Sequence, residues 1–344
     1  MKLSVIDQSP VPAGFTPADA LHNTIELARL ADRLGYERYW IAEHHAIDAL
    51  ASPAPEILIA RVAAETTAIR VGSGGVMLPH YSPFKVAEVF RMLHALYPNR
   101  IDLGIGRAPG GTPLDSYALR RQRNEYPPPD DFPQQLVELL AFLNHSFPPD
   151  HPFSRIRISP EMPGSPEVWM LGSSMWSASA AAQVGLPYAF AHFIDQQPTR
   201  AALEHYRAHF KPGDGMTGLA APRAIVALGV ICADTETEAQ RLLMSPRLFR
   251  RRIRQGNLQL IPTPEEAIEE LGAVPDSAPP APSEWPRYFA GTPERIRDHL
   301  IDMASVLHLD EIMVVTVVHD HQARMRSYQL LAEAFELAPR SQAK

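Results

Sequence analysis

Short runs of β-branched and aromatic residues alternate with amphipathic helical patterns along the whole chain of 344 residues. This alternation is typical of βα units around a parallel sheet, and it is not expected of an all-β sandwich or a helix bundle. Most of the strand-like runs are continuously apolar, as strands are when helices cover one face and a filled barrel lies on the other. Eight such runs are visible, at residues 3–6, 39–42, 69–71, 101–105, 168–171, 188–191, 224–231 and 312–318. The count predicts an α/β protein with the closed (β/α)8 fold known as the TIM barrel.

Composition narrows the class of protein further. Hydrophobic residues make up 45% of the chain, but no stretch of about 20 residues is apolar enough for a membrane helix. The first predicted strand follows Met1 almost directly, without the pattern of a signal peptide, so we expect a soluble cytoplasmic protein. A net charge of −7 without a basic run argues against nucleic-acid binding. The single cysteine, Cys232, excludes an internal disulfide and a cysteine-rich metal site, and we expect it to be a buried core residue.

Two proline-rich stretches interrupt the βα rhythm, at residues 108–133 after the fourth predicted strand and 245–293 after the seventh. Neither has the composition of a linker, so we expect a single domain over residues 1–344. Long loops inside a compact domain are commonly lids or binding loops. Both follow strands at the carboxyl end of the barrel, where enzymes of this fold place their active sites. We therefore expect the second stretch to close over a substrate.

Polar residues follow most of the predicted strands and should meet at one barrel mouth. They are Asp7, Gln8, Glu43, His44, His45, Arg107, His192, His319, Asp320 and His321. The run from Glu43 to His45 is the most informative, because three titratable groups directly after an apolar strand need water or a ligand. A metal-dependent hydrolase that uses the last histidines with Asp320 is one hypothesis. Its weakness is that Asp320 should point away from its two neighbours, and each of these residues also has a structural interpretation, such as a helix N-cap.

The residues after the fifth predicted strand have the layout of a phosphate site. They are Gly172, Ser173, Ser174, Met175, Trp176 and Ser177, and a helical pattern follows at residues 178–184. Free backbone N–H groups at a helix N-terminus, small hydroxyl groups and a glycine together favour an anion. Arg107, at the end of the neighbouring strand, adds a guanidinium that can bind a phosphate through two hydrogen bonds. The glycines among residues 72–75 indicate a bulge or the close approach of a flat ligand.

Five segments together resemble the bacterial luciferase-like family of flavin-dependent oxidoreductases, in particular its single-chain members that do not emit light. The segments are residues 40–45, 72–79, 99–107, 171–174 and 291–294, so the likeness spans nearly the whole chain. The resemblance implies a TIM barrel, flavin mononucleotide (FMN) as cofactor and a homodimer. Gly106 stands where the light-emitting subunits carry a reactive cysteine, and the segment after the seventh strand does not match theirs. Luciferase activity is therefore not expected.

The resemblance also assigns roles to residues of this chain. His44 matches the catalytic histidine of the family, and Glu43 lies beside it near the flavin. Gly74 and Gly75 match a pair that is joined by a non-proline cis peptide bond and supports the flavin ring. The resemblance implies that Arg107 and residues 172–177 bind the phosphate of the flavin. In that segment the matching positions are Gly172, Ser173, Ser174 and Ser177, and Met175 and Trp176 lie between them.

The function implied is a monooxygenase that uses reduced FMN and molecular oxygen to oxidise a small organic substrate. No second nucleotide-binding motif such as G-x-G-x-x-G follows a predicted strand, so we expect a separate flavin reductase to supply the reduced cofactor. With an ordinary pKa of about 6.5, His44 would exchange protons near pH 7. Two alternatives stay open: hydride transfer with FMN or a deazaflavin and without oxygen, and a flavin-binding protein without catalysis.

Overall fold

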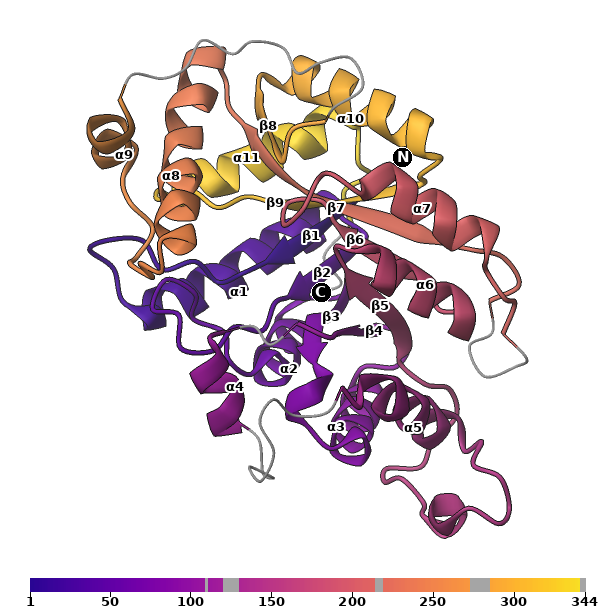
Figure 1. Cartoon of the computed structure of the whole chain (residues 1–344). Helices are drawn as coiled ribbons and strands as arrows, with labels where there is room; N and C mark the ends of the chain where they lie inside the picture. Colours follow the sequence, from indigo (N-terminus) through magenta and orange to yellow (C-terminus); the bar gives the residue numbers. More distant parts are fainter. Residues whose placement is uncertain (109–110, 120–129, 214–218, 273–284, 341–344) are drawn as a thin grey trace.

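A closed ring of eight parallel strands forms the centre of the molecule (Figure 1). The computed structural model describes residues 1–108, 111–119, 130–213, 219–272 and 285–340. The ring follows the order β1, β2, β3, β4, β5, β6, β7, β9, and the pairing of β9 with β1 closes it. The strands are β1 Lys2–Asp7, β2 Arg38–Ile41, β3 Arg70–Met77, β4 Ile101–Gly106, β5 Glu167–Gly172, β6 Tyr188–Ala191, β7 Ala224–Cys232 and β9 Glu311–Val315. The predicted TIM barrel is confirmed.

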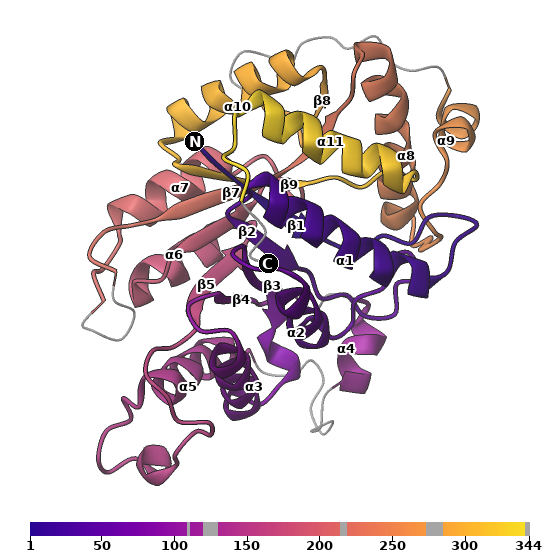
Figure 2. The ribbon, with the colours of Figure 1, turned by 180° about the vertical axis from the view of Figure 1, so that it is seen from behind.

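Helices surround the ring on the outside, as the opposite views of Figures 1 and 2 show. Their bounds are α1 Pro17–Leu34, α2 Pro55–Glu65, α3 Pro83–Leu96, α4 Pro113–Leu119, α5 Phe132–Asn144, α6 Met175–Val184, α7 Thr199–Ala208, α8 Glu236–Arg254, α9 Pro264–Leu271, α10 Pro293–Leu307 and α11 His321–Ala334, with short 3-10 turns at Leu78–His80 and Pro152–Arg155. No helix in the described parts of the chain is long and apolar enough to cross a membrane.

A ninth strand, β8 (Tyr288–Gly291), was not predicted. It pairs with the last four residues of β7, beyond the stretch that β6 uses and overlapping the stretch that β9 uses at Gly229. The four-residue strand directly follows a proline-rich segment, so its sequence alone has too little pattern to stand out. The long β7 therefore carries three neighbours along its length.

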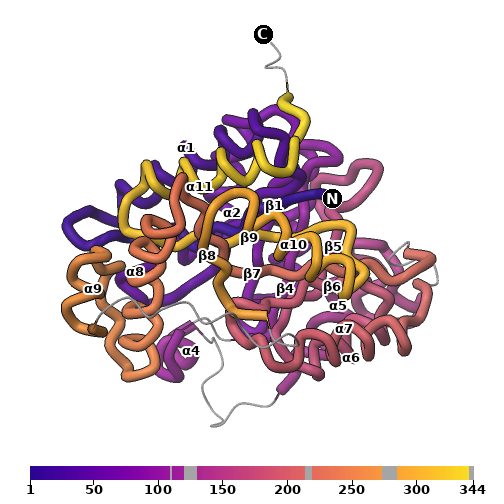
Figure 3. The backbone as a smooth tube through the Cα atoms, turned by 90° about the horizontal axis from the view of Figure 1, so that it is seen from above, coloured from indigo at the N-terminus to yellow at the C-terminus, as the bar shows by residue number. Residues whose placement is uncertain are grey.

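The two proline-rich stretches contain more regular structure than the expected loops. Residues 245–254 belong to α8, and α9 and β8 also lie within the second stretch, so its description as one long loop is wrong. Figure 3 shows α8 and α9 side by side at one end of the molecule. The first stretch contains α4, and residues 109–110, 120–129 and 273–284 of the two stretches lie outside the described residues. The described parts of the second stretch are thus the end of α8, α9 and β8, and the expectation that this stretch closes over a substrate stays a prediction.

Apolar side chains fill the barrel and form the floor of the site. Ile6, Trp40, Trp169 and Met313 belong to one buried cluster, in which the two indole rings meet edge to face at 5.4 Å. A larger cluster packs the helices onto the outside of the strands, and it includes Cys232, which is buried as expected. Because interiors are close-packed, the cluster inside the barrel gives the residues above it a rigid base.

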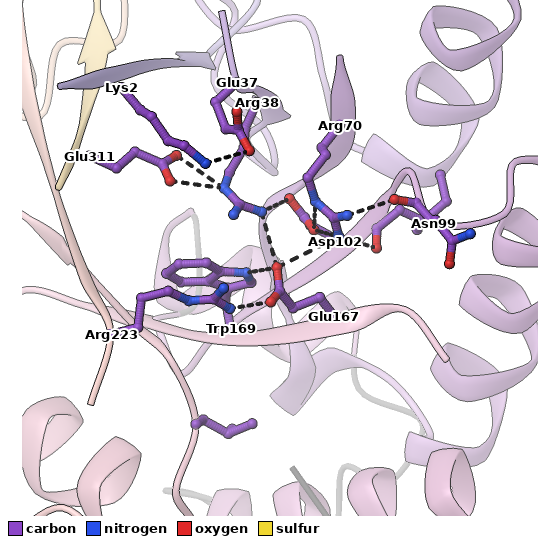
Figure 4. Close-up of polar contacts among 12 residues, drawn as sticks. Lys2, Glu37, Arg38, Arg70, Asn99, Asp102, Glu167, Trp169, Arg223 and Glu311 are labelled. Atoms are coloured by element: carbon purple, nitrogen blue, oxygen red, sulfur yellow. Dashed lines mark hydrogen bonds and ion pairs between the residues drawn. The ribbon is translucent and has the colours of Figure 1, made fainter. Parts of the chain in front are cut away.

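The amino end of the barrel carries a network of buried charges (Figure 4). Arg38 and Asp102 lie at its centre, with Arg38 Nη1 2.8 Å from the carboxylate of Asp102 and Arg38 Nε 3.0 Å from Glu311. Arg70 also binds Asp102. Glu167 forms ion pairs with both Arg38 and Arg70. The network lies at the end of the barrel away from the strand carboxyl ends, so the charged groups there contribute to the fold rather than to the mouth.

Candidate active site

A cavity of about 560 Å³ opens at the carboxyl ends of the strands. Its size lies in the range of small-molecule and cofactor sites. Ten of the eleven residues predicted for the site line it, namely Glu43, His44, Gly74, Gly75, Arg107, Gly172, Ser173, Ser174, Trp176 and Ser177. Met175 is the exception, because as the first residue of α6 it turns outward and is 39% exposed. The structure therefore brings groups from four strands to one cavity, as expected of a barrel mouth.

The first wall is the glycine-rich end of β3. The peptide bond between Gly74 and Gly75 is cis, as the family resemblance implied. β3 continues to Met77 rather than ending at residue 71, and its register against β4 shifts between Ser73 and Val76, which is the predicted bulge. A side chain at Gly75 would come within 2.8 Å of the Gly104 carbonyl oxygen. Only glycine leaves the backbone at this wall open to a flat ligand.

The second wall is the N-terminus of α6. Ser174 is the N-cap residue in an extended conformation, so the backbone N–H groups of the first helical turn point toward the cavity mouth. The Ser177 hydroxyl is already engaged: it donates to the Ser174 carbonyl at 2.8 Å and lies 2.9 Å from the Tyr188 hydroxyl. Ser177 therefore shapes the turn. An anion at this place would meet the free N–H groups, the half-buried Ser173 and the exposed Ser174.

Arg107 extends from the end of β4 to the same place. Its guanidinium carbon lies 4.4 Å from the centre of the Trp176 ring, which is in the first turn of α6. The guanidinium also pairs with Asp130 at 3.0 Å, and both side chains are about half exposed. Stacking on Trp176 directs the arginine toward the helix N-terminus, while the exposed ion pair with Asp130 is weak enough for a bound anion to replace it.

His44 follows β2 and contributes a partly buried ring to the cavity. Its Nδ1 atom is buried without a hydrogen-bond partner among the described residues. Burial, together with the neighbouring His45, lowers the pKa of His44 from 6.5 to about 4. The expectation of an ordinary pKa of about 6.5 is therefore wrong, and the ring is neutral at physiological pH. A neutral ring in this position keeps one nitrogen able to accept a hydrogen bond.

Glu43 is almost fully buried, and its carboxylate ties three segments together. It accepts hydrogen bonds from the Tyr81 hydroxyl at 2.7 Å and from the Met77 backbone at 3.1 Å, and it lies 2.7 Å from His45 Nε2. Burial and the carboxylate raise the pKa of Tyr81 well above its usual range, so this hydroxyl stays a donor. These contacts fix the end of β3 against β2, directly beside Gly75. Tyr81 was not predicted, because it lies four residues beyond the strand it supports.

The other polar residues at the strand ends do not join this cavity, apart from Gln8. His192 lies 2.7 Å from the Thr199 hydroxyl and 3.0 Å from the Pro286 carbonyl, and His319 contacts the Ala13 carbonyl at 2.9 Å. His321 pairs with Glu26, and Asp320 is the N-cap of α11.

No group of three or more potential ligands that would hold a metal exists among the described residues. The site proposed for a metal-dependent hydrolase is therefore not formed there. Asp7 is likewise structural: burial acts to raise its pKa, but Arg324 and Tyr39 bring it below the usual value.

The cavity also has an apolar wall that the sequence did not reveal. Phe193 and Ile194, in the turn after β6, line it together with Ala191, Ala227 and Met313. Ala191 ends a predicted strand, but the turn that follows carries no motif. Its position becomes visible only when the barrel is closed.

These features fit FMN. The glycine wall of β3 has the open backbone that a flat ring system needs, and the α6 N-terminus with Arg107 offers N–H groups and a positive charge to a phosphate monoester. The unpartnered Nδ1 of His44 is a buried polar atom that a bound ring system would supply with a hydrogen bond. The residues present therefore match the chemistry of the ring system and of the phosphate of the cofactor.

Comparisons with known proteins agree with this geometry. Among solved structures, the crystal structure of apo-MsnO8 superimposes with a TM-score of 0.89 at 54% identity, covering 98% of this chain and 99% of that chain. The protein YceB of Bacillus subtilis (strain 168) is 43% identical over 340 residues, which is 97% of this chain and 99% of YceB. The N-acetyl-S-alkylcysteine monooxygenase of the same organism is 35% identical over 342 residues, covering 99% of this chain and all of that protein.

The family model described as luciferase-like monooxygenase matches residues 1–307. These residues include all ten predicted site residues that line the cavity. The chain therefore belongs to the luciferase-like monooxygenase family.

Proposed function

We propose that this protein is an FMN-dependent monooxygenase that oxidises a small organic substrate with molecular oxygen. The observation that carries the proposal is the single cavity in which the glycine wall of β3, the N-terminus of α6 and Arg107 meet. Together they provide the groups needed to bind a flat ring system and a phosphate group. Family membership supports the same assignment.

When bound, reduced FMN supplies the two electrons that reduce one atom of O2 to water while the other atom enters the substrate. The protein contributes binding and orientation. Gly74 and Gly75 support the ring, the α6 N-terminus and Arg107 hold the phosphate, and Glu43 fixes the β3 wall through Met77. His44, neutral at pH 7, accepts or passes a proton at Nδ1. The buried apolar cluster around Trp40 would exclude water from the floor of the flavin site.

The proposal is tested by two measurements. Titration with FMN and with a deazaflavin, followed by fluorescence, identifies the cofactor. Oxygen consumption with chemically reduced FMN is then compared with product formation from aldehydes, ketones and thioethers. Thioethers come first, because a relative at 35% identity is named for oxidation of N-acetyl-S-alkylcysteine. Product carrying one atom from labelled O2 supports a monooxygenase; hydride transfer without oxygen, or binding without turnover, contradicts it.

The wider organisation follows from the same proposal. We infer that residues 1–344 act as one domain, that a separate reductase supplies reduced FMN and that the enzyme works in the cytoplasm as a homodimer. Exposed apolar side chains on neighbouring helices α2 and α3, namely Ile57, Met92 and Leu96, support a subunit interface. Light scattering after size-exclusion chromatography measures the subunit number directly.

A further inference from the structure

We propose that Arg250 and Arg287 are positioning residues that set the selectivity of the apolar part of the cavity. Neither residue lines the cavity. Both bind the backbone of the turn after β6, which carries Phe193 and Ile194 into it. This inference rests on the proposed function, because it assigns the apolar wall to the substrate.

The two arginines reach one short turn from distant elements. Arg250, on α8, donates to the carbonyl oxygens of Phe193 at 3.0 Å and Ile194 at 3.2 Å. Arg287, directly before β8, donates to the Ile194 carbonyl at 2.7 Å and, through Nε, to the Gln196 side chain at 2.6 Å. The Ile194 carbonyl thus accepts from both guanidinium groups. A carbonyl oxygen has two lone pairs, and a pair of charged donors uses both.

Further contacts join the same two segments beside the arginines. His192, at the start of the turn, lies 3.0 Å from the Pro286 carbonyl, next to Arg287. Arg200, at the start of α7, lies over the Trp285 ring at 5.3 Å. The turn after β6 is therefore attached to the segment before β8 along residues 192–200. Residues of α8 and of the segment directly before β8 therefore hold the turn after β6 in place.

The middle of the turn gains from such support because it lies at the surface. Ile194 is 54% exposed although it lines the cavity, and outside the arginines the middle of the turn is held by the Phe193 N–H bond to the Ala227 carbonyl and by local turn hydrogen bonds to the Ala191 carbonyl. Segments with few buried contacts and exposed backbone open easily. Without Arg250 and Arg287 the carbonyl groups would have only water as partners, and Phe193 and Ile194 would no longer keep one position.

The cavity has two parts that differ in chemistry. The glycines of β3, Arg107 and the α6 N-terminus form the part suited to FMN. Phe193, Ile194, Ala191 and Met313 form an apolar part without an ionisable group. An apolar wall selects substrates by size, and each methylene group that fits or does not fit changes the binding free energy by a modest amount. Arg250 and Arg287 therefore determine which chain lengths fit, while leaving the flavin part unchanged.

The test compares Arg250→Ala, Arg287→Ala and Arg287→Lys with Arg207→Ala. Arg207, on α7, also donates to two carbonyl groups, those of Leu307 at 2.6 Å and His308 at 3.0 Å, but it does not contact the turn. Arg207→Ala thus removes the same kind of interaction away from the cavity. The probes are FMN, followed by fluorescence, and a series of alkyl methyl sulfides from ethyl to octyl, followed as sulfoxide formation. Hydrogen exchange of the peptide covering residues 192–199 is measured on each protein.

We expect the KM for the best sulfide to rise about tenfold in Arg250→Ala and Arg287→Ala, with kcat and the FMN dissociation constant within about twofold of wild type. The preference should move toward longer chains. Exchange in residues 192–199 should become about tenfold faster in these two variants. Arg287→Lys keeps the positive charge but loses the planar guanidinium with its several N–H donors. Its KM and its hydrogen-exchange rate should therefore lie between those of the wild type and those of Arg287→Ala. Arg207→Ala should match the wild type in all three measurements.

The outcomes separate this inference from the proposed function. A wild type that binds FMN but oxidises none of the sulfides contradicts the substrate assignment, whereas hydrogen exchange still tests whether the arginines order the turn. Unchanged exchange and unchanged KM in both alanine variants overturn the inference even when the monooxygenase is active. Loss of FMN affinity in these variants also overturns it, because the wall would then belong to the flavin part.

Discussion

At the scale of single residues, the site combines groups that are already engaged with groups that wait for a ligand. Glu43 and Ser177 are satisfied by protein partners, so they shape the cavity. His44 Nδ1 has no partner among the described residues, and the ion pair of Arg107 with Asp130 is exposed to solvent. Unsatisfied groups in a cavity indicate where a ligand gains most binding free energy, because no existing protein hydrogen bond has to be broken there.

The first residue-scale prediction concerns the buried His44 in the cofactor-free protein. Its pKa in the folded state is about 4, against 6.5 for an ordinary histidine. As the pH falls from about 6.5 to about 4, the unfolded chain binds a proton that folded His44 does not, so the free energy of unfolding decreases. This dependence is absent above pH 6.5. His44→Gln should flatten the loss of stability between these pH values, measured by urea unfolding.

The exposed His22→Gln serves as the control for that series, because His22 lies on the surface of α1. It should follow the wild-type pH dependence. Equal slopes for His44→Gln and wild type would show that burial does not suppress protonation of His44. In the flavin-loaded enzyme, His44→Ala should reduce turnover while leaving FMN affinity nearly intact, since the phosphate contacts lie elsewhere.

The second residue-scale prediction concerns the ion pair of Arg107 and Asp130. Arg107→Ala should weaken FMN binding by about tenfold to a hundredfold, as expected when a charged hydrogen bond to a phosphate is lost. Asp130→Asn removes the competing carboxylate and should strengthen binding by up to about fivefold, in line with a weak exposed pair. Fluorescence titration at low and high salt measures both. Weaker binding in Asp130→Asn would mean that Asp130 positions Arg107 rather than competing for it.

At the scale of elements, the cavity is made of strand ends and one helix N-terminus, and their meeting depends on close packing. Gly172 ends β5 where Ser177 of α6 approaches, and a β-carbon there would lie 2.3 Å from the Ser177 hydroxyl oxygen. The short β8 extends the sheet and brings Arg287 to the turn after β6. Small residues and a four-residue strand therefore decide how the elements approach one another.

The element-scale prediction is that Gly172→Ala separates β5 from the α6 N-terminus. The added methyl group needs a shift of the helix start, so stability should fall by about 1–3 kcal/mol and FMN binding should weaken strongly. Gly106→Ala is the matched control, because a β-carbon at Gly106 meets no described atom within 4 Å and the fold should be unaffected. Thermal unfolding and FMN titration on both variants provide the measurement. Equal stability of the two variants would contradict the argument.

At the scale of the whole molecule, the barrel separates stability from chemistry. Its carboxyl end holds the cavity, and its amino end holds the buried charge network of Figure 4. In that network Asp102 binds Arg38, Arg70 and the Trp40 indole N–H, the last at 2.9 Å. Trp40 continues upward to the floor of the cavity, so the two ends share one buried side chain.

The prediction at this scale is that Asp102→Ala destabilises the fold by about 3–5 kcal/mol, because it removes a buried carboxylate that binds Arg38, Arg70 and the Trp40 indole N–H at once. Asp234→Ala breaks an ion pair with Arg326 on the surface and should cost less than about 1 kcal/mol. Urea unfolding compares the two variants. At a temperature where Asp102→Ala stays folded, its FMN affinity should remain close to that of the wild type. A small effect on stability would show that the network is dispensable.

The sequence by itself determined the barrel and most of its mouth. Eight of the nine strands, the α6 N-terminus and ten lining residues were predicted, because apolar periodicity, glycine positions and strand-end polarity are properties of neighbouring residues. The tertiary structure alone decided the rest. It placed β8, made His44 neutral, occupied Glu43 with Tyr81 and Met77 and joined Arg250 and Arg287 to one turn. The burial of a side chain and its hydrogen-bond partners depend on the residues that surround it in space, and those residues are far apart in the chain.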